Sequence, residues 1–174
     1  MLAIARASEF PRAATEEAAD ALIAKGGCVM VMRLPQVHDT RRQGRITWHI
    51  ETARQKGRVA YVGEGRNRLP AVHVTDAVQA YRLALERGSP GARYHAVAEE
   101  GVALRDIAEM IGESLKLPVE SITLAGAAAY FGGLASLAVI DLAASSLLTR
   151  RELGWAPTGP DLLTDLRNMD YGAT

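Results

Sequence analysis

Apolar residues follow two spacings along this chain, one typical of helices and the other of strands. Where apolar side chains recur every three or four positions, the spacing predicts helices at 11–25, 45–56, 76–87, 104–115 and 162–169. Short apolar runs predict strands at 28–34, 58–62, 71–74, 93–98 and 119–123. Because the predicted strands and helices alternate, the pattern indicates an α/β fold.

Glycine, proline and capping residues mark the expected ends of these elements. Gly26 ends the first helix and Pro35 ends the first strand. Thr75 is the expected N-cap of the helix that follows it. Glycines and a proline predict a loop over 63–70. Further helical stretches are expected toward the C-terminus, at 125–137 and 142–148, and as one turn within 149–157.

Composition limits the partners that the protein can be expected to bind and the compartment in which it is expected to occur. The 174 residues suffice for one domain with a sizeable core. Lys and Arg number 20, as do Asp and Glu, so the formal net charge is zero. This balance argues against a nucleic acid or an anionic membrane surface as the main partner. Cys28 is the only cysteine, which excludes an internal disulfide; we expect it to be buried in a strand, and a reducing cytoplasm fits.

Three segments allow more than one interpretation. The stretch 124–140 carries no formal charge, but its many Ala and Gly residues favour a buried or interface helix over a membrane span. Residues 1–10 are expected to be a non-native leader or to follow an internal start, with a short natural arm as the alternative. The basic run of Arg41, Arg42 and Arg45 is interpreted as a solvated helix entry, or alternatively as a phosphate-binding patch.

The centre of the chain carries two motif elements in a fixed order. A G-(D/E)-G-x-(Q/N) element is followed by a V-H-V-x-D-x-(A/V)-x-A element, and the matching residues are Gly63, Glu64, Gly65, Asn67, Val72, His73, Val74, Asp76, Val78 and Ala80. In these residues the chain resembles the extended short-chain dehydrogenases/reductases of the NAD(P)-dependent epimerase/dehydratase type.

Two further segments extend this resemblance over 11–171, nearly the whole chain. TRRELGWAP, at 149–157, is similar to the closing K/R-x-x-L-G-W-x-P signature of the family. VMRLPQVHD, at 31–39, resembles the strand and loop that face the nicotinamide and the substrate. The resemblance implies a partial Rossmann-type sheet plus the small substrate-binding domain. It predicts that 11–174 form a single α/β substrate-side domain that lacks the N-terminal cofactor-binding half.

Departures from the family pattern concern the chemistry. The chain contains no G-x-G-x-x-G or G-x-x-G-x-x-G loop, which would hold a cofactor pyrophosphate at a helix N-terminus. None of its tyrosines has a lysine four residues later. The slot of the family's Tyr-x-x-x-Lys pair falls near Arg12 and Glu16, and neither side chain can act as the residue that it replaces.

The candidate substrate contacts are Arg33 and Asn67, which the family positions imply, and Arg68. Arg68 is next to Leu69, which stands where the family usually has a phosphate-gripping arginine. No metal site is expected, because a metal needs converging ligands and the four histidines are scattered, at His38, His49, His73 and His95.

The candidate catalytic residues are His38, Asp39 and His73. His38 and Asp39 follow a predicted strand, where α/β folds place chemistry, so they could bind substrate or act as a general base. The alternative is a loop histidine capped by its neighbouring carboxylate. His73 belongs to a motif that is mainly structural in the family, where the histidine packs and forms hydrogen bonds.

Two functional hypotheses follow from different classes of protein. The first is a truncated epimerase/dehydratase-like protein without oxidoreductase turnover alone; we expect no cofactor for this chain, although the parent family uses NAD(P). Apolar surface left by the missing half predicts a homodimer or higher oligomer, possible by exchange of the N-terminal helix. The second is a weak ester or phosphoester hydrolase that uses His38, Asp39 and His73, or an intersubunit pocket. A separate polypeptide that supplies the cofactor half is a third option.

Overall fold

The computed structural model describes residues 13–172, so the expected leader at 1–10 lies outside the described residues. The helices are α1 (Ala13–Ala24), α2 (Ile46–Lys56), α3 (Val74–Arg87), α4 (Leu104–Leu115), α5 (Leu124–Phe131), the 3-10 turn η1 (Gly132–Leu134), α6 (Leu147–Leu153) and α7 (Leu162–Asn168). The strands are β1 (Val31–Arg33), β2 (Gln36–His38), β3 (Val59–Val62), β4 (Arg68–His73), β5 (Arg93–His95), β6 (Glu99–Ala103) and β7 (Val119–Ile122).

The strands of the described residues form three small sheets. β1 pairs in parallel with β5, and β3 pairs in parallel with β7. The central sheet has the order β2-β4-β6, in which β2 is parallel and β6 antiparallel to β4. The α/β class predicted from the alternating pattern is therefore confirmed.

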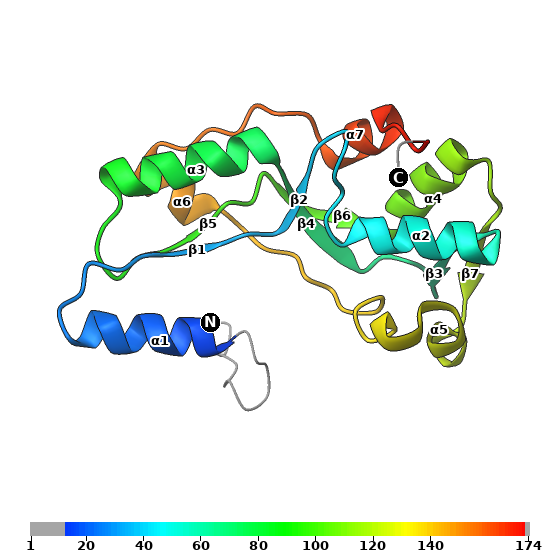
Figure 1. Ribbon diagram of the computed structural model, residues 1–174, viewed down its shortest axis with the longest axis horizontal. Helices are drawn as coiled ribbons and strands as arrows, with labels where there is room; N and C mark the ends of the chain where they lie inside the picture. The colour runs from blue at the N-terminus through cyan, green and yellow to red at the C-terminus, as the bar shows by residue number, and fades with distance from the viewer. Residues whose placement is uncertain (1–12, 173–174) are drawn as a thin grey trace.

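The molecule is elongated, with two helical regions joined by the β2-β4-β6 sheet (Figure 1). At one end α3 and α6 lie along β1 and β5, and at the other α2, α4 and α5 surround β3. α1 lies at the outer edge of the first region, and Ala19 is its one buried residue. The buried hydrophobic residues of the described part of the chain form three clusters. The largest lies around Ile46, Ile50, Ile111, Leu162 and Leu166, the second around Tyr94, Leu153 and Trp155, and the third around Ala60, Tyr130 and Phe131.

A buried carboxylate at the start of α3 fixes the path of the chain after α6. Asp76 is 4% exposed. Its carboxylate accepts hydrogen bonds from the backbone amides of Thr158, at 3.1 Å, and Gly159, at 2.8 Å. The indole nitrogen of Trp155 donates to the Asp76 carbonyl oxygen at 3.0 Å. The segment before α7 is thereby attached to the first turn of α3, and α7 is carried across to the opposite region.

The structure differs from the expected secondary structure in three places. Residues 68–70, which were expected in a loop, form the start of β4, because this part of the chain pairs with β6. Neither β2 nor β6 was predicted, since both are short and lack an alternating apolar pattern. The expected helix at 142–148 is wrong: 140–146 run without regular structure, and the Leu142 amide donates to the Arg68 carbonyl oxygen at 2.9 Å instead.

Two single-residue expectations are also corrected. The N-cap of α3 is His73 rather than Thr75, and the His73 side chain accepts a hydrogen bond from the Thr75 amide. Cys28 is exposed, because β1 begins only at Val31 and leaves the preceding residues in the connection from α1. In the uncharged stretch 124–140 the chain forms α5 and then η1, and no helix of the described residues is long and apolar enough to span a membrane.

Candidate functional site

His38 lies at the end of β2, where the parallel pairing with β4 places it opposite His73. The His38 side chain is buried, with 1% of its surface exposed. Its Nδ1 donates a hydrogen bond to Oδ2 of Asp165, on α7, at 2.7 Å. The His38 and His73 rings meet edge to face, with centroids 5.7 Å apart. The structure thus brings two of the three predicted catalytic residues together around a carboxylate that the sequence analysis missed.

The second nitrogen of His38 has no hydrogen-bond partner among the described residues. It lies 3.8 Å from Oε2 of Glu99, on β6. Burial lowers the pKa of His38, although the hydrogen bond to Asp165 acts in the opposite direction. Burial also raises the pKa of Glu99, and the Leu162 amide donates to its Oε2 at 2.8 Å. Burial thus acts on both groups in the direction of their neutral forms.

Asp39 and His73 have other partners within their own segments. Oδ1 of Asp39 accepts hydrogen bonds from the amides of Arg41 and Arg42, both at 2.6 Å, so Asp39 folds back on its own loop. Nδ1 of His73 lies 2.8 Å from the Thr75 hydroxyl, and its Nε2 lies 3.6 Å from Oδ2 of Asp165. His73 therefore faces the His38 cluster while capping α3.

Arg33, a predicted substrate contact, is occupied by a carboxylate of α1. Its Nε and Nη2 donate to the two carboxylate oxygens of Glu16, at 2.7 and 2.5 Å. The hydrogen bond from Arg33 lowers the pKa of Glu16 despite its partial burial. Arg93 contacts both Glu16 and Asp20, so α1 is attached to β1 and β5 mainly through ion pairs.

Asn67 and Arg68, the other predicted substrate contacts, hold the irregular segment after η1. Nδ2 of Asn67 donates to the carbonyl oxygens of Ala138, at 3.0 Å, and Ile140, at 3.4 Å. Arg68 forms a bidentate ion pair with the Asp141 carboxylate, in which its Nε donates to Oδ1 at 3.0 Å and its Nη2 donates to Oδ2 at 2.7 Å. Both side chains thus hold residues 138–141 in place. Arg33 lies apart from them, on the sheet of β1 and β5.

A wide cleft lies beside the connection between β1 and β2. Its volume is about 520 Å³, within the range of small-molecule sites. Its walls come from β1–β2, the entry to α2, β4 and the segment after η1, and the lining residues are Leu34, Pro35, Gln36, Val37, Gly44, Arg45, Leu69, Pro70 and Leu142. The walls of this cleft do not include His38, Asp39 or His73.

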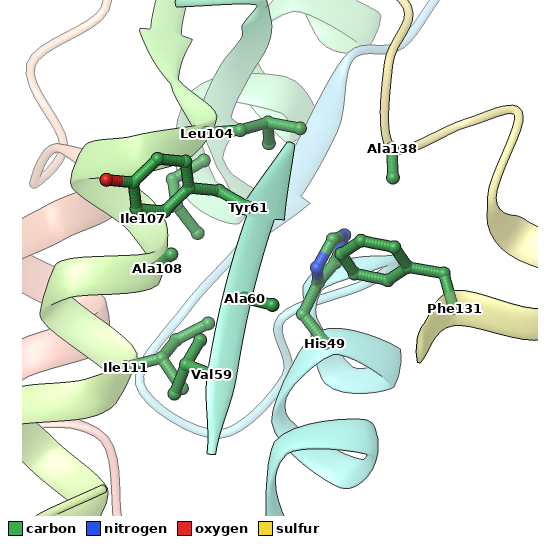
Figure 2. Close-up of a pocket in the computed structure, with 10 residues that line it drawn as sticks. All are labelled: His49, Val59, Ala60, Tyr61, Leu104, Ile107, Ala108, Ile111, Phe131 and Ala138. Atoms are coloured by element: carbon green, nitrogen blue, oxygen red, sulfur yellow. The ribbon is translucent and has the colours of Figure 1, made fainter. Parts of the chain in front are cut away.

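A smaller cavity lies around β3, between the helices that cover it. In Figure 2, Tyr61 and Val59 lie on the α4 side of the strand, and Ala60 faces His49 and Phe131 on the other. The cavity holds about 10 Å³, close to the least that one water molecule needs. The His49 and Phe131 rings meet edge to face at 5.5 Å. This cavity is therefore a packing void of the core rather than a ligand site.

His49 is the most strongly perturbed histidine of the described residues. Burial, together with the nearby charge of Arg45, lowers the pKa of His49 to about 4. Arg45 precedes His49 by one helical turn. His49 is consequently neutral near pH 7, and Arg45 is the closest source of charge on that side of α2.

Metal binding has no support among the described residues, because no group of three or more His, Cys, Asp or Glu side chains could hold an ion there. The predicted absence of a metal site stays a prediction for the whole protein.

Comparison with known sequences places part of this chain in a family. The NAD dependent epimerase/dehydratase family matches residues 12–97. "Uncharacterized protein C2A9.02" of Schizosaccharomyces pombe is 41% identical over 163 residues, which are 93% of this chain and 55% of that protein. "Uncharacterized protein YLL056C" of Saccharomyces cerevisiae is 40% identical over 161 residues, which are 92% of this chain and 54% of that protein. The chain spans about half the length of the curated relatives that it matches.

Solved structures show the same relation at the level of the fold. The dTDP-glucose 4,6-dehydratase DesIV of Streptomyces venezuelae, with NAD and TYD bound, superposes with a TM-score of 0.65 at 19% identity, over 91% of this chain and 49% of that chain. Residues 12–97 thus match the NAD dependent epimerase/dehydratase family, and the chain has part of the extended short-chain dehydrogenase/reductase fold. The resemblance predicted from the motifs is confirmed.

His49 makes the stability of the protein depend on pH. Unfolded histidine takes up a proton below about pH 6.5, whereas folded His49 stays neutral down to about pH 4. Because the unfolded state then binds more protons, we expect His49 to reduce the free energy of unfolding by about 2 kcal/mol between pH 7 and pH 5. Urea denaturation at both pH values measures the loss.

The variant His49→Gln is the comparison for this pH dependence. His38 and His95, whose pKa values are also lowered by burial, remain in the variant and act in the same direction. We therefore expect a smaller but nonzero loss in His49→Gln. An equal loss in both proteins would show that folded His49 takes up a proton in this range as readily as unfolded histidine does.

Proposed function

We propose that this chain is the substrate-side part of an NAD(P)-dependent epimerase/dehydratase-like protein, and that residues 1–174 alone do not transfer hydride. The observation that carries the proposal is the cleft of about 520 Å³ beside Leu34–Val37. These residues lie in the segment that, by resemblance, faces the nicotinamide and the substrate. The cleft supplies a ligand wall in the expected place, made from β1–β2, β4 and the entry to α2.

The residues present do not fit a bound NAD(P) molecule. The 174 residues contain no glycine-rich loop for the pyrophosphate. Glu16 stands in the slot of the family's lysine, and its carboxylate is paired with Arg33 and Arg93. A carboxylate there cannot supply the positive charge of a lysine. We therefore derive no hydride-transfer step for this chain.

Cofactor titration tests this proposal. The purified chain is titrated with NAD⁺, NADH, NADP⁺ and NADPH, followed by calorimetry and by nicotinamide fluorescence. We expect no saturable binding up to millimolar concentration, because the pyrophosphate has no loop to accept it. Saturable binding by the chain alone would contradict the proposal. A shortened parallel titration with Glu16→Lys, which restores the family's charge, separates the effect of this slot from the effect of the absent loop.

A weak hydrolase is the second candidate function. The observation that favours it is the His38–Asp165 hydrogen bond of 2.7 Å, since a carboxylate that orients an imidazole is the arrangement of hydrolytic bases. The free Nε2 of His38 would be the proton acceptor. Against it, that nitrogen is buried, so a substrate would need the strand end or α7 to move.

Hydrolysis of p-nitrophenyl acetate and p-nitrophenyl phosphate tests the second candidate. If His38 and His73 act as the base, we expect the rate to fall about 100-fold in His38→Ala and in His73→Ala. Asp39→Asn is the matched control, because Asp39 is turned toward its own loop. A rate that survives equally in all three variants would remove these residues from the mechanism.

We also propose that the chain self-associates through its N-terminal helix. α1 buries only Ala19 among its own residues and is attached mainly by the ion pairs of Glu16 and Asp20. In the sheet of the described residues, β1 pairs with β5 on one side only. Large apolar side chains are exposed in both regions of the molecule, namely Leu22, Leu34, Trp48, Leu85, Leu124 and Leu147. An α1 that docks on the Arg33 and Arg93 of a second copy would cover part of this surface.

Sedimentation velocity over a hundredfold range of concentration tests self-association. We expect a dimer at tens of micromolar, and a shift toward monomer in the double variant Arg33→Gln, Arg93→Gln, because both partners of the α1 carboxylates are removed. Arg66→Gln is the control, since that side chain is largely exposed. A monomer at every concentration would refute the proposal.

A further inference from the structure

Arg45 lies where two hollows of the surface meet. It lines the cleft of about 520 Å³ beside β1–β2. It also lines a smaller hollow between α2 and the α5–η1 segment, whose other residues are Trp48, His49, Thr52, Phe131, Leu134 and Leu137. The side chain at the entry to α2 is therefore shared by both hollows.

The backbone at Arg45 is held in a defined position. The Arg45 amide donates to Oε1 of Gln36 at 3.1 Å, and Nε2 of the same Gln36 donates to the Gln43 carbonyl oxygen. Gly44 has a φ of +47°, and a Cβ there would lie 2.9 Å from Nε2 of Gln36. The loop can therefore approach β2 this closely only with glycine before Arg45. A fixed entry to α2 holds the backbone of Arg45 beside the cleft that its side chain lines.

The charge of Arg45 is not compensated within the described part of the chain. Arg33, Arg68 and Arg93 each pair with a carboxylate, whereas no described acidic side chain lies within ion-pair distance of Arg45. Arg45 is also the one charged residue among those that line the larger cleft. Burial lowers the pKa of Arg45, and its charge contributes to the lowered pKa of His49. A half-buried cation without a partner is costly, and a bound anion would offset that cost.

We infer that the larger cleft binds a small organic anion, whose carboxylate or phosphate group pairs with the guanidinium of Arg45. Arginine presents a planar fork that suits either group. The other walls, including Leu34, Pro35 and Leu69, are mainly apolar and fit an uncharged body attached to the anionic group. The inference deepens the proposed function, on which it rests for the assignment of this cleft to the substrate.

Binding is measured with phenyl phosphate, benzoate, inorganic phosphate and benzyl alcohol, by two independent signals. The first signal is tryptophan fluorescence: Trp48 is 45% exposed and lines the smaller hollow beside Arg45, whereas Trp155 is 1% exposed. The second signal is the NMR titration of His49. An anion at Arg45 offsets its charge and should raise the pKa of His49, which a purely structural role of Arg45 would not produce.

Three variants separate the charge of Arg45 from other effects. We expect Arg45→Gln to weaken binding of the aryl anion at least about tenfold, because a charge-assisted hydrogen bond is lost. Arg45→Lys keeps the charge without the fork and should lie between this variant and the wild type. Arg41→Gln removes an exposed charge from the same basic run and should bind as the wild type does. Circular dichroism checks that each variant is folded.

The outcomes distinguish the anion class and the two proposals. Tighter binding of phenyl phosphate than of benzoate assigns a phosphate ester, and the reverse assigns a carboxylate; benzyl alcohol should bind at least tenfold more weakly than either. Equal binding by Arg45→Gln and the wild type, or no binding of either aryl anion, would overturn the inference. Neither result depends on cofactor binding, so a failure here leaves the titration with NAD(P) to decide the proposed function separately.

Discussion

The buried carboxylate of Asp76 is the constraint on which the arrangement of both regions depends. Its oxygens accept the amides of Thr158 and Gly159, and its carbonyl oxygen accepts the indole of Trp155. A buried carboxylate must be satisfied by donors, and here they come from a segment about 80 positions away. A Cβ on Gly159 would lie 2.8 Å from the Asp76 carboxylate, so glycine is required at this crossing. The V-H-V-x-D motif, which contains Asp76, and the closing L-G-W-x-P motif, which contains Trp155, therefore meet in this one contact.

The contact between Asp76 and the segment at 158–159 places α7 in the region of α2 and α4, and this position of α7 forms the polar cluster around Asp165. α7 packs against α4 through Leu162 and Leu166, which are fully buried. On the same helix, Asp165 reaches His38 and approaches His73. The cluster joins β2, β4, β6 and α7 in one network, which explains why the ends of three strands converge there. Because this cluster is largely buried, its first role is to join these four elements.

The arginines of the chain fall into two groups with different consequences. Arg33, Arg68 and Arg93 are paired with carboxylates and hold two segments in place, namely α1 and the irregular stretch near Asp141. The Arg68–Asp141 pair is exposed and so contributes little stability, whereas the pairs of Arg33 and Arg93 with Glu16 are partly buried. Arg45 belongs to the second group, since its partner is not found among the described residues. The candidate substrate contacts Arg33, Asn67 and Arg68 thus hold neighbouring segments in this structure, and their contact with a substrate stays a prediction.

The sequence by itself determined the helices with strong apolar periodicity, such as α3 and α4, and the family that residues 12–97 match, because spacing and motif residues are local properties of the chain. Only the tertiary structure decided which polar residues meet. β2 and β6 exist because β4 offers them hydrogen bonds, and the Asp165–His38 contact joins residues 127 positions apart. A buried aspartate between Leu162 and Leu166 on an apolar helix face was the available signal for that contact. The partner of such an aspartate depends on chain crossings, such as the one at Asp76, that local patterns do not encode.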